Sequence, residues 1–260
     1  MRLIANISML FTELPLAERL EAAHSAGFRG VEIQFPEDAD IDPLRAAVER
    51  AGIDIVLINV PRGPGDAVGL AALPGEEAAF RSAVAQCAAQ ARRLAVGKVN
   101  VLAGRPPSGA DPATCRAVLK DNLIHAADQM AQIGVRVMVE PVNRIDVPGF
   151  FLSGLAPTLE LLEEIGHPNL ALQFDLYHMA ITEPDLGAAI MQAGRWIGHV
   201  QFADTPGRHE PGSGHVDFAA AIRALRGVGY DGELSAEYRP AGTTGEGLSW
   251  MATFERMMVA

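Results

Sequence analysis

Four segments of the sequence change abruptly from apolar residues to a side chain that carries a polar oxygen. The β-branched run Val135–Val139 ends on Glu140, and Pro141 follows at once, which is typical of the end of a buried strand. Later apolar runs end in the same way at Asp175, Gln201 and Glu237. If these strands are parallel neighbours, the oxygens converge at one edge of the sheet. Clustered carboxylates repel each other, and a hard divalent cation, Mg²⁺ or Mn²⁺, offsets that repulsion with an all-oxygen ligand set.

Two other interpretations of these side chains stay open from the residues alone. A Glu at a strand end is often simply solvated, or it pairs with a nearby arginine, for which Arg144 and Arg239 are available. The repetition of the pattern favours a shared cation, and the predicted ligands are Glu140, Asp175, Gln201 and Glu237.

Further polar residues near predicted strand ends are suited to contact a substrate. His178 follows Asp175 by three residues and, as a neutral imidazole, has one N–H donor for a substrate oxygen. Arg208 lies in a glycine-rich loop and is suited to bind the carboxylate of an anionic substrate, with Arg62 and Arg105 as weaker candidates. The remaining predicted contacts are Asn59 and Asp146. Each of these residue types is also common in structural or solvated positions.

An alternation of strand and helix patterns positions these residues. The predicted strands are Leu3–Ile7, Gly30–Phe35, Ile53–Val60, Lys98–Gly104, Val135–Glu140, Leu170–Asp175, Trp196–Ala203 and Glu233–Tyr238. The helices between them are predicted to begin at or near Pro15, Pro43, Glu76, Asp111, Pro157, Asp185, Val216 and Gly245. About eight such units are typical of a single-domain α/β fold, a (β/α)8 TIM barrel over residues 1–260. A doubly wound open sheet would require a glycine-rich phosphate turn after the first strand, and the sequence has none there.

The composition excludes several classes of function. The chain of 260 residues has a formal net charge of −11 and a pI of about 5.1, which argues against binding to nucleic acid or to an anionic membrane. The apolar N-terminal segment is too short to span a bilayer. Cys87 and Cys115 lack metal-type spacing and are expected to be reduced, as in a cytoplasmic protein. The motifs of zinc proteases, P-loop proteins and serine hydrolases are absent, and a homo-oligomer stays open.

Longer motifs around these residues resemble the hydroxypyruvate isomerase family of xylose-isomerase-like barrels. The motifs are A-N-I-S-M-L-F from Ala5, G-F-R-G-V-E from Gly27, E-P-V-N-R-I-D-V-P-G-F from Glu140, Q-F-D-L-Y-H-M from Gln173, G-H-V-Q-F-A-D from Gly198, R-H-E-P-G-S-G from Arg208 and E-Y-R-P from Glu237. Each motif is weak by itself, but together they extend over nearly the whole chain and are specific.

This resemblance implies an aldose–ketose type isomerase that acts on a small anionic oxo-acid. The reaction would interconvert hydroxypyruvate and 2-hydroxy-3-oxopropanoate by proton transfer through an enediolate. The resemblance also implies Glu140 and Glu237 as the acid–base pair, and the same four residues as ligands of a divalent cation. Gln201 stands where related sugar epimerases have His, which agrees with the hydroxypyruvate branch.

The sequence departs from the family pattern in one loop. The usual P-A-G-D-W is P-R-G-P-G-D-A here, from Pro61 to Ala67, and Ile58 replaces a His that the family often has. These departures concern the substrate, so a 2-oxotetronate isomerase or a ketose 3-epimerase stays open. An AP endonuclease-like enzyme would require several His ligands and a basic groove, which seven His and a charge of −11 disfavour. A non-catalytic ligand-binding protein is the remaining alternative.

Overall fold

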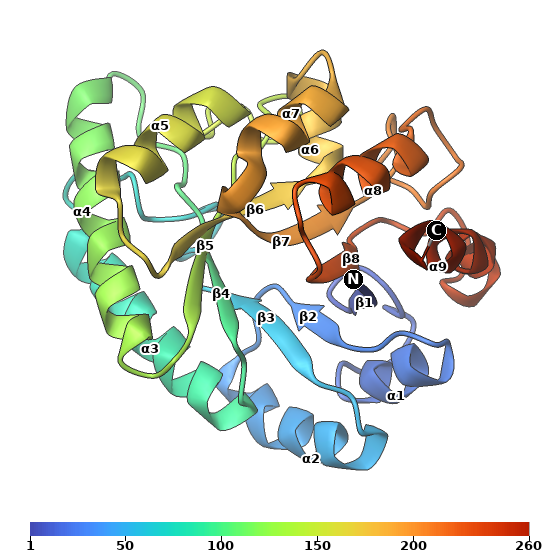
Figure 1. Ribbon diagram of the computed structural model, residues 1–260. Coiled ribbons are helices and arrows are strands. Elements are labelled where there is room, and N and C mark those ends of the chain that lie inside the picture. Colours follow the sequence, from blue (N-terminus) through green and yellow to red (C-terminus); the bar gives the residue numbers. More distant parts are fainter. Residues whose placement is uncertain (260) are drawn as a thin grey trace.

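Eight parallel strands form a closed barrel in the computed structural model, which describes residues 1–259 (Figure 1). The strands pair in chain order, and β8 pairs with β1. Their bounds are β1 Arg2–Asn6, β2 Val31–Ile33, β3 Ile55–Asn59, β4 Lys98–Val101, β5 Arg136–Val139, β6 Leu170–Asp175, β7 Ile197–Phe202 and β8 Glu233–Ala236. The predicted (β/α)8 TIM barrel is therefore confirmed, and all strand ends that carry the predicted site lie at the same end of the barrel.

Helices surround the strands on the outside (Figure 1). Their bounds are α1 Glu18–Ser25, α2 Ile41–Ala51, α3 Glu77–Leu94, α4 Pro112–Ala131, α5 Leu155–Ile165, α6 Leu176–Thr182, α7 Leu186–Ala193, α8 Phe218–Gly227 and α9 Met251–Val259. Short 3-10 turns cover η1 Asp38–Asp40, η2 Gly194–Trp196 and η3 Gly245–Trp250. Within the described residues, no helix combines the length and the apolar content that crossing a membrane requires.

Capping residues mark the ends of helices at positions that the sequence predicts, as Asp111 and Gly166 show. The side chain of Asp111 accepts hydrogen bonds from the backbone N–H groups of Ala113 and Thr114, with Pro112 at the first helical position of α4. Gly166 ends α5 in the left-handed conformation, with φ 61°.

The helices differ most from the predictions at three places. The first helix begins at Glu18 rather than near Pro15, because Pro15 to Ala17 form a preceding turn. The predicted last helix divides into η3 and α9. Helix α6 was not predicted, because its seven residues are too few to show helical periodicity. Asp175 is the N-cap of α6 and accepts a hydrogen bond from the Tyr177 N–H, so this carboxylate has a structural role as well.

The apolar core of the barrel has two parts, and much of the barrel interior is polar. The larger core lies between strands and helices, and it includes Leu172 and Phe174 from one face of β6. Inside the barrel, a smaller apolar cluster contains Leu57, Met138 and Ala171. The rest of the interior toward the carboxyl ends of the strands carries buried polar side chains, which must be hydrogen-bonded to each other to be tolerated.

Candidate active site

The four predicted ligand residues lie at the carboxyl ends of β5 to β8, and all are buried. Asp175 and Gln201 belong to β6 and β7, whereas Glu140 and Glu237 directly follow β5 and β8. They reach this position because parallel strands of a barrel expose their last residues at one rim. Ligand atoms of Glu140, Asp175 and His178 lie within 4.8 Å of one another, a grouping that could hold a metal ion.

Arg208 connects two of these carboxylates. Its Nη2 lies 3.2 Å from Oδ2 of Asp175 and also pairs with Oε2 of Glu237. The guanidinium lies over the ring of Tyr177, 5.0 Å from its centroid. Burial by itself would lower the Arg208 pKa, but the neighbouring carboxylates outweigh it and raise the pKa. An ion pair at a strand end therefore exists, but its arginine comes from the β7–α8 loop. Neither Arg144 nor Arg239 provides it.

Burial is the main cause of the raised pKa values of the clustered carboxyl groups. It raises the pKa of Glu140 well above its usual range, and the charges of Glu237 and Asp175 raise it further. Burial raises the pKa of Asp175 to about 6 and that of Glu237 to about 8, although Arg208 opposes both changes. Such carboxylates are costly as bare anions, and a divalent cation bound by their oxygens would reduce that cost.

A hydrogen bond from Asn143 determines the tautomer of His178. Oδ1 of Asn143 accepts from the backbone N–H groups of Ile145 and Asp146, at 3.0 and 2.9 Å, so its Nδ2 must face the ring. That Nδ2 lies 2.7 Å from Nδ1 of His178, which therefore accepts. Burial lowers the His178 pKa well below its usual value, and Arg208 lowers it further.

The hydrogen of this neutral ring is thus on Nε2, which faces the carboxylates. Nε2 lies 3.7 Å from Oε1 of Glu140 and 3.6 Å from Oδ2 of Asp175. A protonated Nε2 is a donor and not a metal ligand. Although His178 is close enough to be counted in a metal-binding group, this tautomer directs a hydrogen-bond donor, and not a lone pair, at the carboxylates.

Buried amides hold Glu140 and Gln201 in place. Nδ2 of Asn100 donates to Oε2 of Glu140 at 2.7 Å, and Nε2 of Gln173 donates to the same oxygen at 3.0 Å. Nε2 of Gln173 also lies 2.7 Å from Oε1 of Gln201. The sequence prediction did not include Asn100 or Gln173, although each is a polar residue inside an apolar strand, where alternate side chains face the barrel axis.

A second buried carboxylate, Glu32, organises the opposite side of this network. Its Oε1 accepts from Asn6 at 2.8 Å and from Gln201 at 2.7 Å, and its Oε2 lies 2.7 Å from Nε2 of His199. Asn6 also donates to Oε1 of Glu237, at 2.8 Å. Burial alone would raise the Glu32 pKa, but these hydrogen bonds and the His199 charge lower it. Because Glu32 takes the Nε2 of Gln201, the Oε1 of Gln201 is directed away from Glu32.

A cavity of about 160 Å³ lies above the carboxylates. Of the predicted site residues, those that line it are Asn59, Glu140, His178, Arg208 and Glu237. Phe35, Leu102, Val142 and Phe150 form apolar walls, and Gln34 and Arg62 add polar groups. Asp175 and Gln201 lie outside this lining. Asp146 also lies outside it, on an exposed turn where its carboxylate accepts from Asn143 at 3.1 Å.

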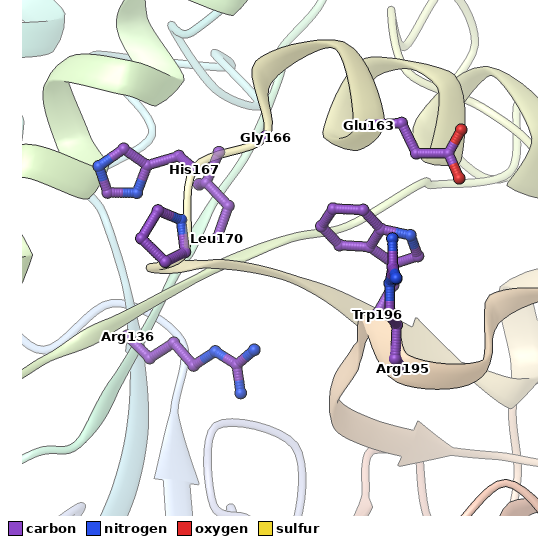
Figure 2. A pocket seen from close by; sticks show the side chains of 8 residues that line it. Arg136, Glu163, Gly166, His167, Leu170, Arg195 and Trp196 are labelled. Atoms are coloured by element: carbon purple, nitrogen blue, oxygen red, sulfur yellow. The ribbon is translucent and has the colours of Figure 1, made fainter.

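A larger cavity, about 480 Å³, lies at the opposite end of the barrel (Figure 2). Its lining includes Arg136 and Leu170, the first residues of β5 and β6, together with His167, Arg195 and Trp196. None of the predicted site residues contributes to it. Although this cavity is larger, the predicted acid–base groups line the smaller cavity, which is therefore the candidate active site.

Comparisons with known proteins agree with this geometry. Residues 20–254 match the family model of the xylose isomerase-like TIM barrel. Hydroxypyruvate isomerase of Escherichia coli (strain K12) is 38% identical over 253 residues, covering 96% of this chain and 98% of that protein. The 2-oxo-tetronate isomerase of Cupriavidus necator is 38% identical over 257 residues, covering 97% and 98%.

A solved structure is similar over nearly the whole length. The crystal structure described as AP endonuclease, family 2, from Brucella melitensis superimposes with a TM-score of 0.93 at 36% identity, covering 97% of this chain and 98% of that one. The family model alone extends over most of the chain, and the relatives share its full length. This chain therefore belongs to the xylose isomerase-like TIM barrel family, with hydroxypyruvate isomerases among its relatives, as the sequence motifs predicted.

Proposed function

We propose that this protein is a hydroxypyruvate isomerase, which interconverts hydroxypyruvate and 2-hydroxy-3-oxopropanoate. The observation that supports it most is that two buried glutamates, Glu140 and Glu237, line one small cavity with raised pKa values. The relative from Escherichia coli, named for this reaction, has nearly the same length. The cavity is well below the roughly 300–1,000 Å³ of sites for drug-sized ligands, which suits a three-carbon substrate.

The reaction requires a proton to leave C3 of hydroxypyruvate and a proton to reach C2, with an enediolate between the two steps. Glu140 and Glu237 are the proposed acid–base pair: one carboxylate takes the C3 proton, and the same group or its partner returns a proton to C2. A catalytic group works best when its pKa is near the working pH, and burial moves the pKa of Glu237 to about 8.

The proposed cofactor is a divalent cation, Mg²⁺ or Mn²⁺, held by oxygens of Glu140, Asp175, Gln201 and Glu237. When bound, the cation supplies positive charge that stabilises the negative charge developing on the substrate oxygens. A carboxylate has two oxygens, so a glutamate can hold the cation through one and exchange a proton through the other. Gln201 fits this set because Glu32 binds its amide nitrogen, and its oxygen, which accepts one hydrogen bond from Gln173, has a second lone pair for the cation.

The remaining predicted residues are proposed substrate contacts. His178 donates its Nε2–H to a substrate oxygen, in the tautomer that Asn143 imposes. Arg208 lines the cavity, and its Nη2 and Nε are bonded to protein oxygens, so substrate would bind to its other N–H groups. Asn59 lies at the end of β3 on the cavity wall, and Asp146 would reach substrate only from the exposed turn.

The substitution Glu237→Gln tests the assignment of the acid–base pair. An amide cannot accept a proton, so we expect turnover of hydroxypyruvate to fall by about 10²-fold or more. Glu255→Gln, at an exposed position of α9, is the matched control and should leave turnover unchanged. Turnover of Glu237→Gln within a few-fold of the parent protein would rule out this role for Glu237.

A second candidate reaction is isomerisation of 2-oxo-tetronate, because the relative from Cupriavidus necator is also 38% identical. A substrate panel of hydroxypyruvate, 2-oxo-tetronate and neutral ketoses separates this activity and ketose 3-epimerisation from the proposed one. The AP endonuclease name of the Brucella melitensis structure adds a DNA substrate with an abasic site to the panel. We expect no cleavage of it, given the net charge of −11. Binding of these ligands without turnover would indicate a non-catalytic protein.

A further inference from the structure

We propose that Arg62, in the loop where this sequence departs from its family, binds the substrate carboxylate at the mouth of the cavity and selects acids over neutral sugars. This inference rests on the proposed function. It concerns which part of the protein recognises the acid group, and not which residues move the proton.

Arg208 is poorly available as the carboxylate anchor that the sequence predicted. Its charge is already shared by Asp175 and Glu237, the two carboxylates that its Nη2 contacts. A substrate carboxylate at Arg208 would become a third anion around one guanidinium, with Glu140 also close. The other arginine on the cavity wall is Arg62. Among residues 1–259, no carboxylate oxygen lies within 4.0 Å of its guanidinium.

The side chain of Arg62 lies against an aromatic wall of the cavity. Its Cζ lies over the ring of Phe35, 5.4 Å from the centroid. A cation–π contact holds a guanidinium beside a ring without using a hydrogen-bond acceptor, so N–H donors remain for a carboxylate, which arginine can bind with two parallel hydrogen bonds. Phe35 itself lines the cavity, so this contact places the cation at the cavity edge.

The backbone of the loop is also held. The carbonyl of Arg62 accepts from the N–H of Gly69 at 3.1 Å, and Gly69 pairs with Ala103 just beyond β4. Gly69 and Gly104 approach so closely that a Cβ on Gly104 would lie 2.1 Å from the Gly69 carbonyl oxygen. Nη2 of Arg105 lies 3.5 Å from Oδ2 of Asp66 in the same loop. The departure from the family pattern is thus a loop fastened to β4, with an arginine at the cavity.

This arrangement orients a short acid in one way. With its carboxylate at Arg62, on the loop that follows β3, the reacting carbons extend toward Glu140 and Glu237. A cavity of about 160 Å³ leaves little room for a longer chain between these points. Neutral ketoses have no group that uses the charge of Arg62, so the preference for acids would depend on this residue.

The experiment compares Arg62→Gln with the parent protein, using hydroxypyruvate as substrate and neutral dihydroxyacetone as a competitive inhibitor. Losing a charge-assisted contact made in both the ground state and the transition state should raise KM about 10- to 100-fold, with kcat within about 3-fold. The inhibition constant of dihydroxyacetone should stay within about 2-fold. Arg62→Lys should restore part of the affinity, and Arg223→Gln, on the exposed face of α8, should change neither constant.

The outcomes separate this inference from the proposed function. If the parent protein isomerises hydroxypyruvate and Arg62→Gln has an unchanged KM, the role of Arg62 is wrong and the function stands. A KM and an inhibition constant that rise together indicate a disturbed loop and also overturn the inference. If the parent protein does not isomerise hydroxypyruvate, the proposed function fails. In that case the binding of hydroxypyruvate and of dihydroxyacetone to the parent protein and to Arg62→Gln still tests whether Arg62 binds the acid group. Weaker binding of hydroxypyruvate alone to the variant supports the inference, and unchanged binding overturns it.

Discussion

At the scale of single residues, Glu32 illustrates how the site is built from groups that do not touch the cavity. This carboxylate is fully buried inside the barrel and accepts hydrogen bonds from Asn6, Gln201 and His199. Two of these partners belong to the proposed site or support it: Gln201 is a proposed ligand, and Asn6 also donates to Glu237. Only an anionic acceptor satisfies three donors at once, so the charge of Glu32 determines which way the neighbouring amides face.

Replacing Glu32 by Gln should therefore destabilise the protein. The new amide brings an N–H₂ group against donors, and it leaves His199 without an anionic partner. Breaking a buried pair of this kind costs about 3–5 kcal/mol, which corresponds to a fall of roughly 6–20 °C in Tm for a chain of this size. Thermal unfolding followed by circular dichroism measures the change. Glu164→Gln, in an exposed pair with Arg116 and Lys120, is the control and should change Tm much less. Equal shifts for the two variants would contradict this view of Glu32.

At the scale of elements, the loop after β3 is joined to the end of β4 by a close approach of two glycines. Gly104 has φ 90°, a conformation that side chains disfavour, and its missing Cβ leaves space for the carbonyl of Gly69. This contact holds the loop that carries Arg62. Conformation and close packing thus both require glycine here, and the two requirements can be separated by experiment.

The variants Gly104→Ala and Gly109→Ala separate the cost of the left-handed conformation from the cost of close packing. Gly109 has φ 84° but nothing within 4 Å of an added Cβ, so its variant suffers only the strain of the left-handed conformation, about 1–2 kcal/mol. Gly104→Ala adds overpacking, typically another 1–3 kcal/mol, and should also raise KM for hydroxypyruvate because the loop shifts. Chemical denaturation and steady-state kinetics check both effects. The idea of a fastened loop is refuted if the two variants behave alike.

At the scale of the whole molecule, this acidic chain, with a net charge of −11, buries several of its carboxyl groups. The folded-state pKa values of Asp175 and Glu237 are raised to about 6 and about 8, above the ordinary values of carboxyl groups near 4. At pH values between the ordinary pKa and the raised pKa of each group, the folded protein binds more protons than the unfolded chain does. The stability that these two groups contribute is full below about pH 4 and is lost as pH rises through 6 and then 8.

A divalent cation should reverse this loss, because it binds the deprotonated carboxylates. In the presence of a chelator, this contribution to Tm should fall from pH 6 to pH 8.5. The rise in Tm on adding Mn²⁺ or Mg²⁺ should be larger at pH 8 than at pH 6. At a cation concentration 100 times the Kd, the gain is about 2.7 kcal/mol, or roughly 5–11 °C. Asp175→Asn should remove most of the cation effect. A cation effect of the same size at both pH values would count against carboxylates as the ligands.

The sequence by itself determined the strands, the helices and the positions of the chemistry along them. Apolar β-branched runs, Gly and Pro positions and caps such as Asp111 act over a few residues, so their effect can be read locally. The same reading placed Glu140, Asp175, Gln201 and Glu237 at strand ends, and the parallel barrel brought these ends to one rim. Helix α6 escaped prediction because seven residues show too little periodicity.

Only the tertiary structure decided which of these groups touch. Arg208 pairs with Asp175 and Glu237 across 33 and 29 residues of chain, and Glu32 meets His199 across 167. Such contacts depend on barrel closure and strand register, which no local pattern encodes. The same closure left Arg62 at the cavity without a carboxylate partner among residues 1–259. In physical terms, short-range backbone preferences set the elements, and the pairing of buried charges follows from how those elements close into a barrel.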